Sequence, residues 1–173
     1  REIEIISKRF GLFDRKETLE QIGEILGITR ERVRQLEKAV LSSLVASAEK
    51  GSLPGLDKYE EAVLAQLTAK GNISRVSALT NSLVGSQDKI EQSRVAFLAL
   101  LSPKLELVED DDDYHASVAV KKDLSVSKIK TEVSKIVDTI KDFKEPKTIK
   151  DISEKVSVAP SELAEALASI SKK

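Results

Sequence analysis

The stretch from Thr18 to Glu37 constrains the fold more than any other part of the sequence, because its residues fit the positions of a helix-turn-helix. Thr18 and Gln21 can form a capping box at the start of the first helix, and Gly23 is small where the two helices would cross. Gly27 suits the left-handed backbone conformation that turns the chain toward the second helix. The apolar positions expected to form the core of this motif are Ile22, Leu26, Ile28, Val33 and Leu36.

The outward face of the second helix carries side chains that suit the edges of base pairs. Thr29 can cap this helix. With the apolar residues turned inward, the residues left on the surface are Arg30, Glu31, Arg34 and Gln35. In a major groove, Arg can form bidentate hydrogen bonds to guanine, Gln can form them to adenine, and Glu can accept a hydrogen bond from cytosine. Arg32 and Lys38 lie to the sides of this face and suit phosphates. The sequence therefore predicts a double-stranded DNA site at Thr29, Arg30, Glu31, Arg32, Arg34, Gln35 and Lys38.

The charge balance supports a local site rather than binding through bulk charge. The chain has 28 Lys and Arg against 29 Asp and Glu, a formal net charge of −1, so any DNA contact needs a local concentration of cations. Residues 30–38 supply one, with four cations and two anions. The alternative is an ordinary surface helix held by i,i+4 pairs, but Arg30 and Arg34 would form a like-charge pair with no stabilising role.

Composition excludes most catalytic chemistry. There is no Cys, which removes disulfides, thiolate metal sites and thiol nucleophiles, and one His leaves no His-rich metal site. No glycine-rich phosphate loop or catalytic constellation occurs, so we expect no enzyme activity, no cofactor and no metal. Few aromatic residues disfavour single-strand binding, and no apolar run is long enough to span a membrane. Because the chain begins at Arg1 without a Met, we expect a fragment or a processed product, with no signal peptide.

Glycine and proline positions divide the chain. Residues 49–56 carry Gly and Pro after a long helical pattern and predict a linker between an N-terminal domain, residues 1–48, and the rest. In residues 57–121 the pattern predicts helices near 58–70, 74–84 and 88–101, followed by a β-hairpin whose tip is Asp110 to Asp113. Three helices and a hairpin suggest a winged helix. The acidic tip is expected to be solvated, and the alternatives are that it binds a cation, binds a basic partner or mimics DNA. His115 is expected to be a plain strand residue.

Residues 122–173 predict three more helices. A long amphipathic helix carries one apolar stripe, consisting of Ile129, Val133, Ile136, Ile140 and Phe143. Helices near 148–156 and 160–171 repeat the apolar template of the first motif 130 residues later, at Ile149, Ile152, Ser153, Val156, Ser157, Val158, Leu163 and Ala166. The surface does not repeat, since Pro160, Ser161, Ala164 and Glu165 replace the cationic face, and we expect a scaffold or protein-contact motif. The predicted fold is mainly α: an N-terminal helix-turn-helix, then tandem winged-helix-like three-helix domains with one short β-hairpin.

Residues 1–12 (REIEIISKRFGL) and 17–39 (ETLEQIGEILGITRERVRQLEKA) closely resemble region 4 of bacterial sigma-70-family transcription initiation factors. The resemblance covers about a quarter of the chain. It implies that Arg30, Glu31, Arg34 and Gln35 face a promoter −35 element and that apolar positions around the first helix contact the polymerase flap. It also implies a cytoplasmic, nucleoid-associated bacterial protein.

The chain departs from that family after the second helix. The family usually continues with a basic tail, whereas this sequence continues Val-Leu-Ser-Ser-Leu-Val-Ala-Ser-Ala, so we expect a weaker grip on phosphates. Core-polymerase-binding and −10-reading regions would have to precede Arg1. The downstream part resembles the HARE-type winged helix of the RNA polymerase delta subunit.

We therefore expect a sigma-like transcription factor that binds duplex DNA, with bacterial RNA polymerase core as a candidate partner and protein contacts through the C-terminal domains. The alternatives are a delta-like polymerase-associated regulator and a dimeric repressor whose seam would be the stripe from Ile129 to Phe143. The oligomeric state is not determined by the sequence.

Overall fold

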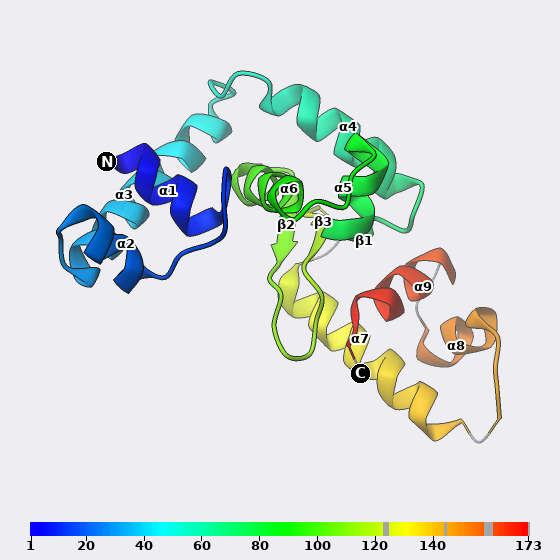
Figure 1. Cartoon of the computed structure of the whole chain (residues 1–173). Helices are drawn as coiled ribbons and strands as arrows, with labels where there is room; N and C mark the ends of the chain where they lie inside the picture. The colour runs from blue at the N-terminus through cyan, green and yellow to red at the C-terminus, as the bar shows by residue number, and fades with distance from the viewer. Residues whose placement is uncertain (123–124, 144, 158–160, 173) are drawn as a thin grey trace.

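The computed structural model describes residues 1–122, 125–143, 145–157 and 161–172, and side chains for all of these except 161 and 162. The chain is mainly α, which confirms the predicted fold class (Figure 1). The helices and strands follow in the order α1 (Glu2–Phe10), α2 (Leu19–Leu26), α3 (Arg30–Glu49), α4 (Leu56–Thr68), β1 (Ile73–Arg75), α5 (Val76–Val84), α6 (Lys89–Leu101), β2 (Leu105–Val108), β3 (Ser117–Val120), α7 (Val126–Asp142), α8 (Ile149–Val156) and α9 (Ser161–Ile170). None of the described helices is both long and apolar enough to cross a bilayer.

The helix-turn-helix forms where the sequence predicts it. The Thr18 hydroxyl accepts from the backbone N–H of Gln21, and the Gln21 side chain accepts from the N–H of Thr18, which completes the capping box. Gly27 ends α2 with φ 65°, in the left-handed region. A Cβ at Gly23 would lie 2.7 Å from the carbonyl oxygen of Ile28, so only glycine allows this close approach of α2 to the turn.

Helices α1, α2 and α3 share a small apolar core. Ile5, Ile22 and Val33 are fully buried at its centre. The partly buried residues around them are Leu19, Leu26, Ile28 and Leu36. Each helix therefore contributes one fully buried residue to this core, and burial of these three apolar side chains holds the helices together.

The second part of the chain has the predicted hairpin and one strand that the sequence analysis missed. Strands β2 and β3 pair antiparallel, with Leu105 opposite Val120 and Val108 opposite Ser117. Strand β1 pairs with the other edge of β3, so the sheet order is β1-β3-β2. The predicted start of a helix near residue 74 is wrong, because residues 73–75 are held extended by hydrogen bonds to a strand more than forty residues away in the chain.

The sheet lies between two helical layers (Figure 1). Val118 points toward α4, α5 and α6, while its neighbour Ala119 belongs to the core formed with α7 and α9, as alternation along a strand requires. One hydrophobic cluster thus spans the domain boundary expected near residue 121. The division into domains 1–48, 57–121 and 122–173 stays a prediction about independent folding, which the packing does not address.

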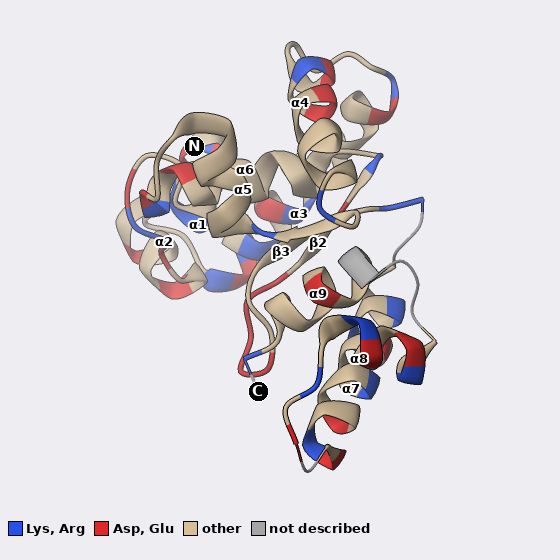
Figure 2. Ribbon diagram, turned by 90° about the vertical axis from the view of Figure 1, so that its right-hand side faces the viewer, with Lys and Arg blue, Asp and Glu red and all other residues tan. Residues whose placement is uncertain are grey.

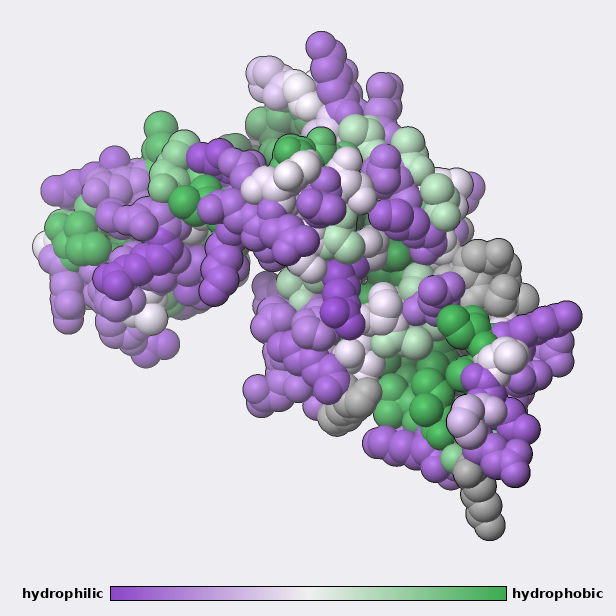
Figure 3. All heavy atoms as spheres, turned by 45° about the vertical axis from the view of Figure 1, so that its right-hand side comes forward, coloured by the Kyte–Doolittle hydropathy of each residue, from purple (hydrophilic) through white to green (hydrophobic). Residues whose placement is uncertain are grey.

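The apolar stripe of α7 is used inside the chain. Ile129, Val133 and Ile136 are at most 1% exposed and pack against the sheet and α9. The expectation that the stripe forms a dimer seam is therefore wrong for these residues, because the same faces already bury intramolecular neighbours. At the far end of α7 the stripe emerges, with Ile140 43% exposed, and apolar side chains gather on this face of the α7–α9 unit (Figure 3).

Helices α8 and α9 follow the spacing of α2 and α3. Thr148 and Asp151 form a capping box for α8, and Ser157 ends α8 in the left-handed region with φ 56°, where the first motif has glycine. Ile170 and Leu167 of α9 are fully buried. The expectations for Val158, Pro160 and the side chain of Ser161 lie outside the described residues.

Candidate nucleic-acid interface

The seven residues expected to bind DNA occupy the start of α3. Thr29 is the N-cap of this helix, and its hydroxyl accepts from the backbone N–H of Arg32 at 3.2 Å. Val33 is fully buried against α1 and α2, which turns the opposite side of the helix to solvent. All seven side chains are exposed: Thr29, Arg30, Glu31, Arg32, Arg34, Gln35 and Lys38. The structure thus brings the candidate residues together on one free surface, and the first helical turn adds its partial positive charge.

A carboxylate at the centre of this surface organises its neighbours. Glu31 accepts two hydrogen bonds from the guanidinium of Arg34, at 2.7 and 2.8 Å, and a third from the amide of Gln35 at 3.3 Å. The hydrogen bonds from Arg34 lower the pKa of Glu31 to about 2. Glu31 is therefore ionised at neutral pH, and it holds Arg34 and Gln35 in one arrangement while cancelling part of their positive charge.

The pair of Glu31 and Arg34 differs from the i,i+4 pairs considered for a surface helix. Its residues are three apart, and i,i+3 residues are also neighbours on a helix, so the spacing alone indicates the pair. The ordinary-surface interpretation thus has more support than expected, since part of this face is self-paired in the free protein.

A second ion pair ties the start of α3 to α2. Arg30 Nε lies 3.0 Å from Glu20 Oε1, and both side chains are more than half exposed. This contact places the first turn of α2 beside the first turn of α3. Two turns further along α3, Glu37 contacts Arg9 of α1 at 3.3 Å, so three helices fix the candidate surface.

The second half of α3 lies beside α6, unlike the exposed first half. Leu41 lines a groove together with Phe97 and Leu100 of α6, and Ala48 is 5% exposed. From α1, the ring of Phe10 packs on Phe97 with their centroids 4.8 Å apart. Part of the apolar stretch that replaces the family's basic tail, at Leu41, thus faces α6.

A further contact locks the loop after α1 to the same helix. Arg94 of α6 donates from Nε to the carbonyl oxygen of Leu12 at 2.8 Å, and its guanidinium lies 5.4 Å from the centre of the Phe13 ring. Helix α6 is the third helix of residues 57–121, the winged-helix unit that the sequence predicts, and in helix-turn-helix modules such a helix reads DNA. Here part of its surface contacts the N-terminal helices.

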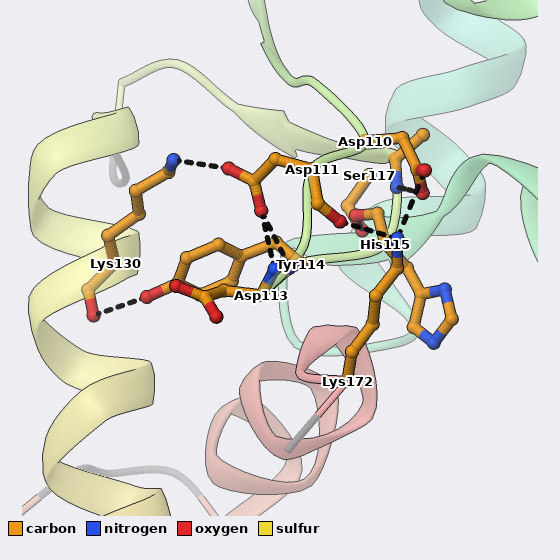
Figure 4. A network of polar contacts seen from close by, with 9 residues as sticks. Asp110, Asp111, Asp113, Tyr114, His115, Ser117, Lys130 and Lys172 are labelled. Atoms are coloured by element: carbon orange, nitrogen blue, oxygen red, sulfur yellow. Dashed lines mark hydrogen bonds and ion pairs between the residues drawn. The ribbon is translucent and has the colours of Figure 1, made fainter.

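The acidic hairpin tip is anchored to the C-terminal unit, as Figure 4 shows. Asp111 accepts from Lys130 of α7 at 2.9 Å and from the backbone N–H groups of Asp113 and Tyr114, and Lys172 contacts Asp110 at 3.0 Å. Hydrogen bonding from Lys130 lowers the pKa of Asp111 to about 2. Both carboxylates stay exposed to solvent, as expected for the tip, but each also forms an ion pair that the sequence did not predict. Figure 2 shows the acidic hairpin close to the C-terminus.

The remaining candidates at the hairpin offer no chemistry. No cluster of three or more His, Asp or Glu side chains placed to hold a metal occurs in the described part of the chain. His115 donates from its backbone N–H to Ile170 at 2.8 Å, and burial lowers the pKa of its imidazole. It lies two residues before β3, in the loop that joins β2 to β3, so the expectation of a strand residue is wrong.

Comparison with known proteins identifies the first three helices. Residues 1–45 match the family model of sigma-70, region 4, as the resemblance predicted. The RNA polymerase principal sigma factor HrdC of Streptomyces coelicolor is 55% identical over 47 residues, which cover 27% of this chain and 14% of that protein. No solved structure matches. The family match therefore covers α1, α2 and most of α3, and the HARE-type resemblance of the later part stays a prediction.

Proposed function

We propose that the chain is a sigma-like transcription factor whose helix α3 enters the major groove of duplex promoter DNA, at a −35-like element. The observation that carries this proposal is the exposed group of Arg and Gln side chains at the start of α3, within a segment that matches sigma-70 region 4. An α-helix with its side chains is about 10–12 Å across, and a major groove is about 12 Å wide. The exposed half of α3 therefore fits into one major groove.

The roles of the candidate residues follow from their positions. Arg34 and Gln35 lie on the outward face and carry the donor and acceptor pairs that read guanine and adenine. Arg32 and Lys38 flank that face and suit phosphates, and the cap residue Thr29 brings the helix N-terminus near the backbone. Glu31 positions Arg34 in the free protein and can accept from cytosine when Arg34 turns to a base.

Bacterial RNA polymerase core is the protein partner that we propose. Ile3 of α1 is 81% exposed and Ile25 of α2 is 53% exposed, both within the sigma-like segment. Exposed apolar side chains that occur singly are common on proteins, so the choice of partner rests on the resemblance, which places the polymerase flap near the first helix. The later units, whose α6 is partly covered by α1 and α3, are proposed to contact protein rather than to read bases.

The test is selection of duplexes by the whole chain from a random pool, with and without core polymerase, followed by titration of Arg34→Ala. We expect a preferred sequence, and an affinity loss of about fivefold to 150-fold for Arg34→Ala at that sequence. An equal loss on random duplex would make Arg34 a phosphate contact. A chain that enriches no sequence but binds polymerase would favour the delta-like regulator instead.

A further inference from the structure

A groove of about 550 Å³ separates the loop after α1 from the winged-helix unit. Arg15 and Lys16 line its first side, and Lys89, the first residue of α6, lines the other. The apolar side chains between them include Val76 and Ala96. Cations from two units that are far apart in sequence thus share one groove.

The positive charge of the two lysines is not cancelled by ion pairs. No salt bridge joins Lys16 or Lys89 to a carboxylate among the described residues, while Arg15 Nε contacts Glu17 at 2.9 Å. Two carboxylates also line the groove. Asp110 is held by Lys172 at 3.0 Å, and the remaining one, Asp14, accepts from the backbone N–H of Arg15 at 2.8 Å.

The groove lies next to the proposed DNA-reading surface. The ion pair between Arg30 and Glu20 places the first turn of α2 beside the start of α3. Lys16 precedes the N-cap Thr18 by two residues, a chain distance of at most about 7 Å. In a helix-turn-helix bound to DNA, the first helix crosses the backbone of the strand beside the occupied groove, and helix N-termini commonly contact phosphates.

We infer that Arg15, Lys16 and Lys89 form a site for the DNA backbone, to which the winged-helix unit contributes Lys89. This inference rests on the proposed function. The occupant is the row of phosphates of the strand that borders the major groove filled by α3. Lys89 stands outside residues 1–45, so the site extends the DNA contact beyond the sigma-like segment. The site also supplies cations for phosphate contacts that the second half of α3 cannot make, because that half is apolar rather than basic.

The experiment measures how the affinity of the full chain for duplex DNA depends on salt. The test variant is Lys89→Gln, and the matched control is Lys58→Gln, which removes an exposed lysine from the first turn of α4, away from the groove. Loss of one phosphate contact should make the slope of log affinity against log salt shallower by about 0.9. The loss of affinity should be the same on preferred and random duplexes, because phosphates carry no sequence information.

Each outcome has a distinct meaning. A shallower slope for Lys89→Gln, with an unchanged slope for Lys58→Gln, supports the backbone site. If Lys89→Gln leaves the slope unchanged while Arg34→Ala still weakens binding to the preferred duplex, the backbone site is refuted and the proposed function stands. If the unaltered chain binds no duplex even at low salt, both are refuted.

Discussion

Gly23 gives a sharp test of how α2 and α3 position the candidate surface. In Gly23→Ala the new Cβ would lie 2.7 Å from the Ile28 carbonyl oxygen, whereas ordinary contact begins at 3.4 Å, so the two must separate by about 0.7 Å. Such overpacking typically costs about 1–3 kcal/mol, and the better helix propensity of Ala offsets about 1 kcal/mol. The expected net destabilisation is about 0–2 kcal/mol.

Hydrogen exchange is the appropriate assay, because it reports on α1 to α3 separately from the rest of the chain. The backbone N–H groups of Ile22 and Val33, which bond to Thr18 and Thr29, should exchange up to about 30-fold faster in Gly23→Ala. The displaced Ile28 carbonyl directly precedes the cap of α3, so affinity for the preferred duplex should also fall.

Gly27→Ala is the matched control. Its φ is 65°, and a Cβ there would meet nothing within 4 Å, so the substitution strains the backbone by about 1–2 kcal/mol without pushing on the turn. It should speed exchange while leaving the DNA affinity of the folded molecule unchanged. If Gly23→Ala slows exchange and binds DNA normally, the close approach at Ile28 does not position α3 and the reasoning fails.

Two further predictions concern carboxylates. Glu31→Gln should strengthen binding to random duplex and steepen the salt dependence of that binding, because Arg34 loses the partner that cancels its charge. The control Glu61→Gln on α4 should change neither the affinity nor the salt dependence. Weaker binding by Glu31→Gln would contradict this prediction. Hydrogen bonding from Lys130 lowers the pKa of Asp111 from 3.8 to about 2. The ionised Asp111 therefore stabilises the folded protein above pH 4, and this stabilisation is lost as the pH falls toward 2. Asp111→Asn should therefore reduce the acid dependence of hairpin stability, followed by NMR of Tyr114, and an unchanged profile would exclude the ion pair as its source.

Local rules explain which parts of the fold were predictable. The capping box of Thr18 and Gln21 and the left-handed Gly27 involve groups only a few residues apart, so the sequence specifies them directly. The hairpin was predictable from alternating apolar residues on either side of an acidic run. The pair of Glu31 and Arg34 was equally local and was missed by considering only one helical spacing.

Contacts between distant segments were not predictable in this way. Strand β1 exists because β3 offers it a free edge, and three residues carry too little pattern to indicate it beforehand. The stripe of α7 indicated burial but not its partner, which turned out to be the sheet and α9 rather than a second chain.

The amino-acid order alone determined the helix-turn-helix and its outward cationic face, since helical periodicity and caps act within a few residues. The tertiary structure alone decided that the apolar half of α3 packs on α6 and that Lys89 lies across a groove from Lys16. Such placements depend on which distant surfaces bury the most apolar area together, a choice made by the whole chain rather than by any one segment.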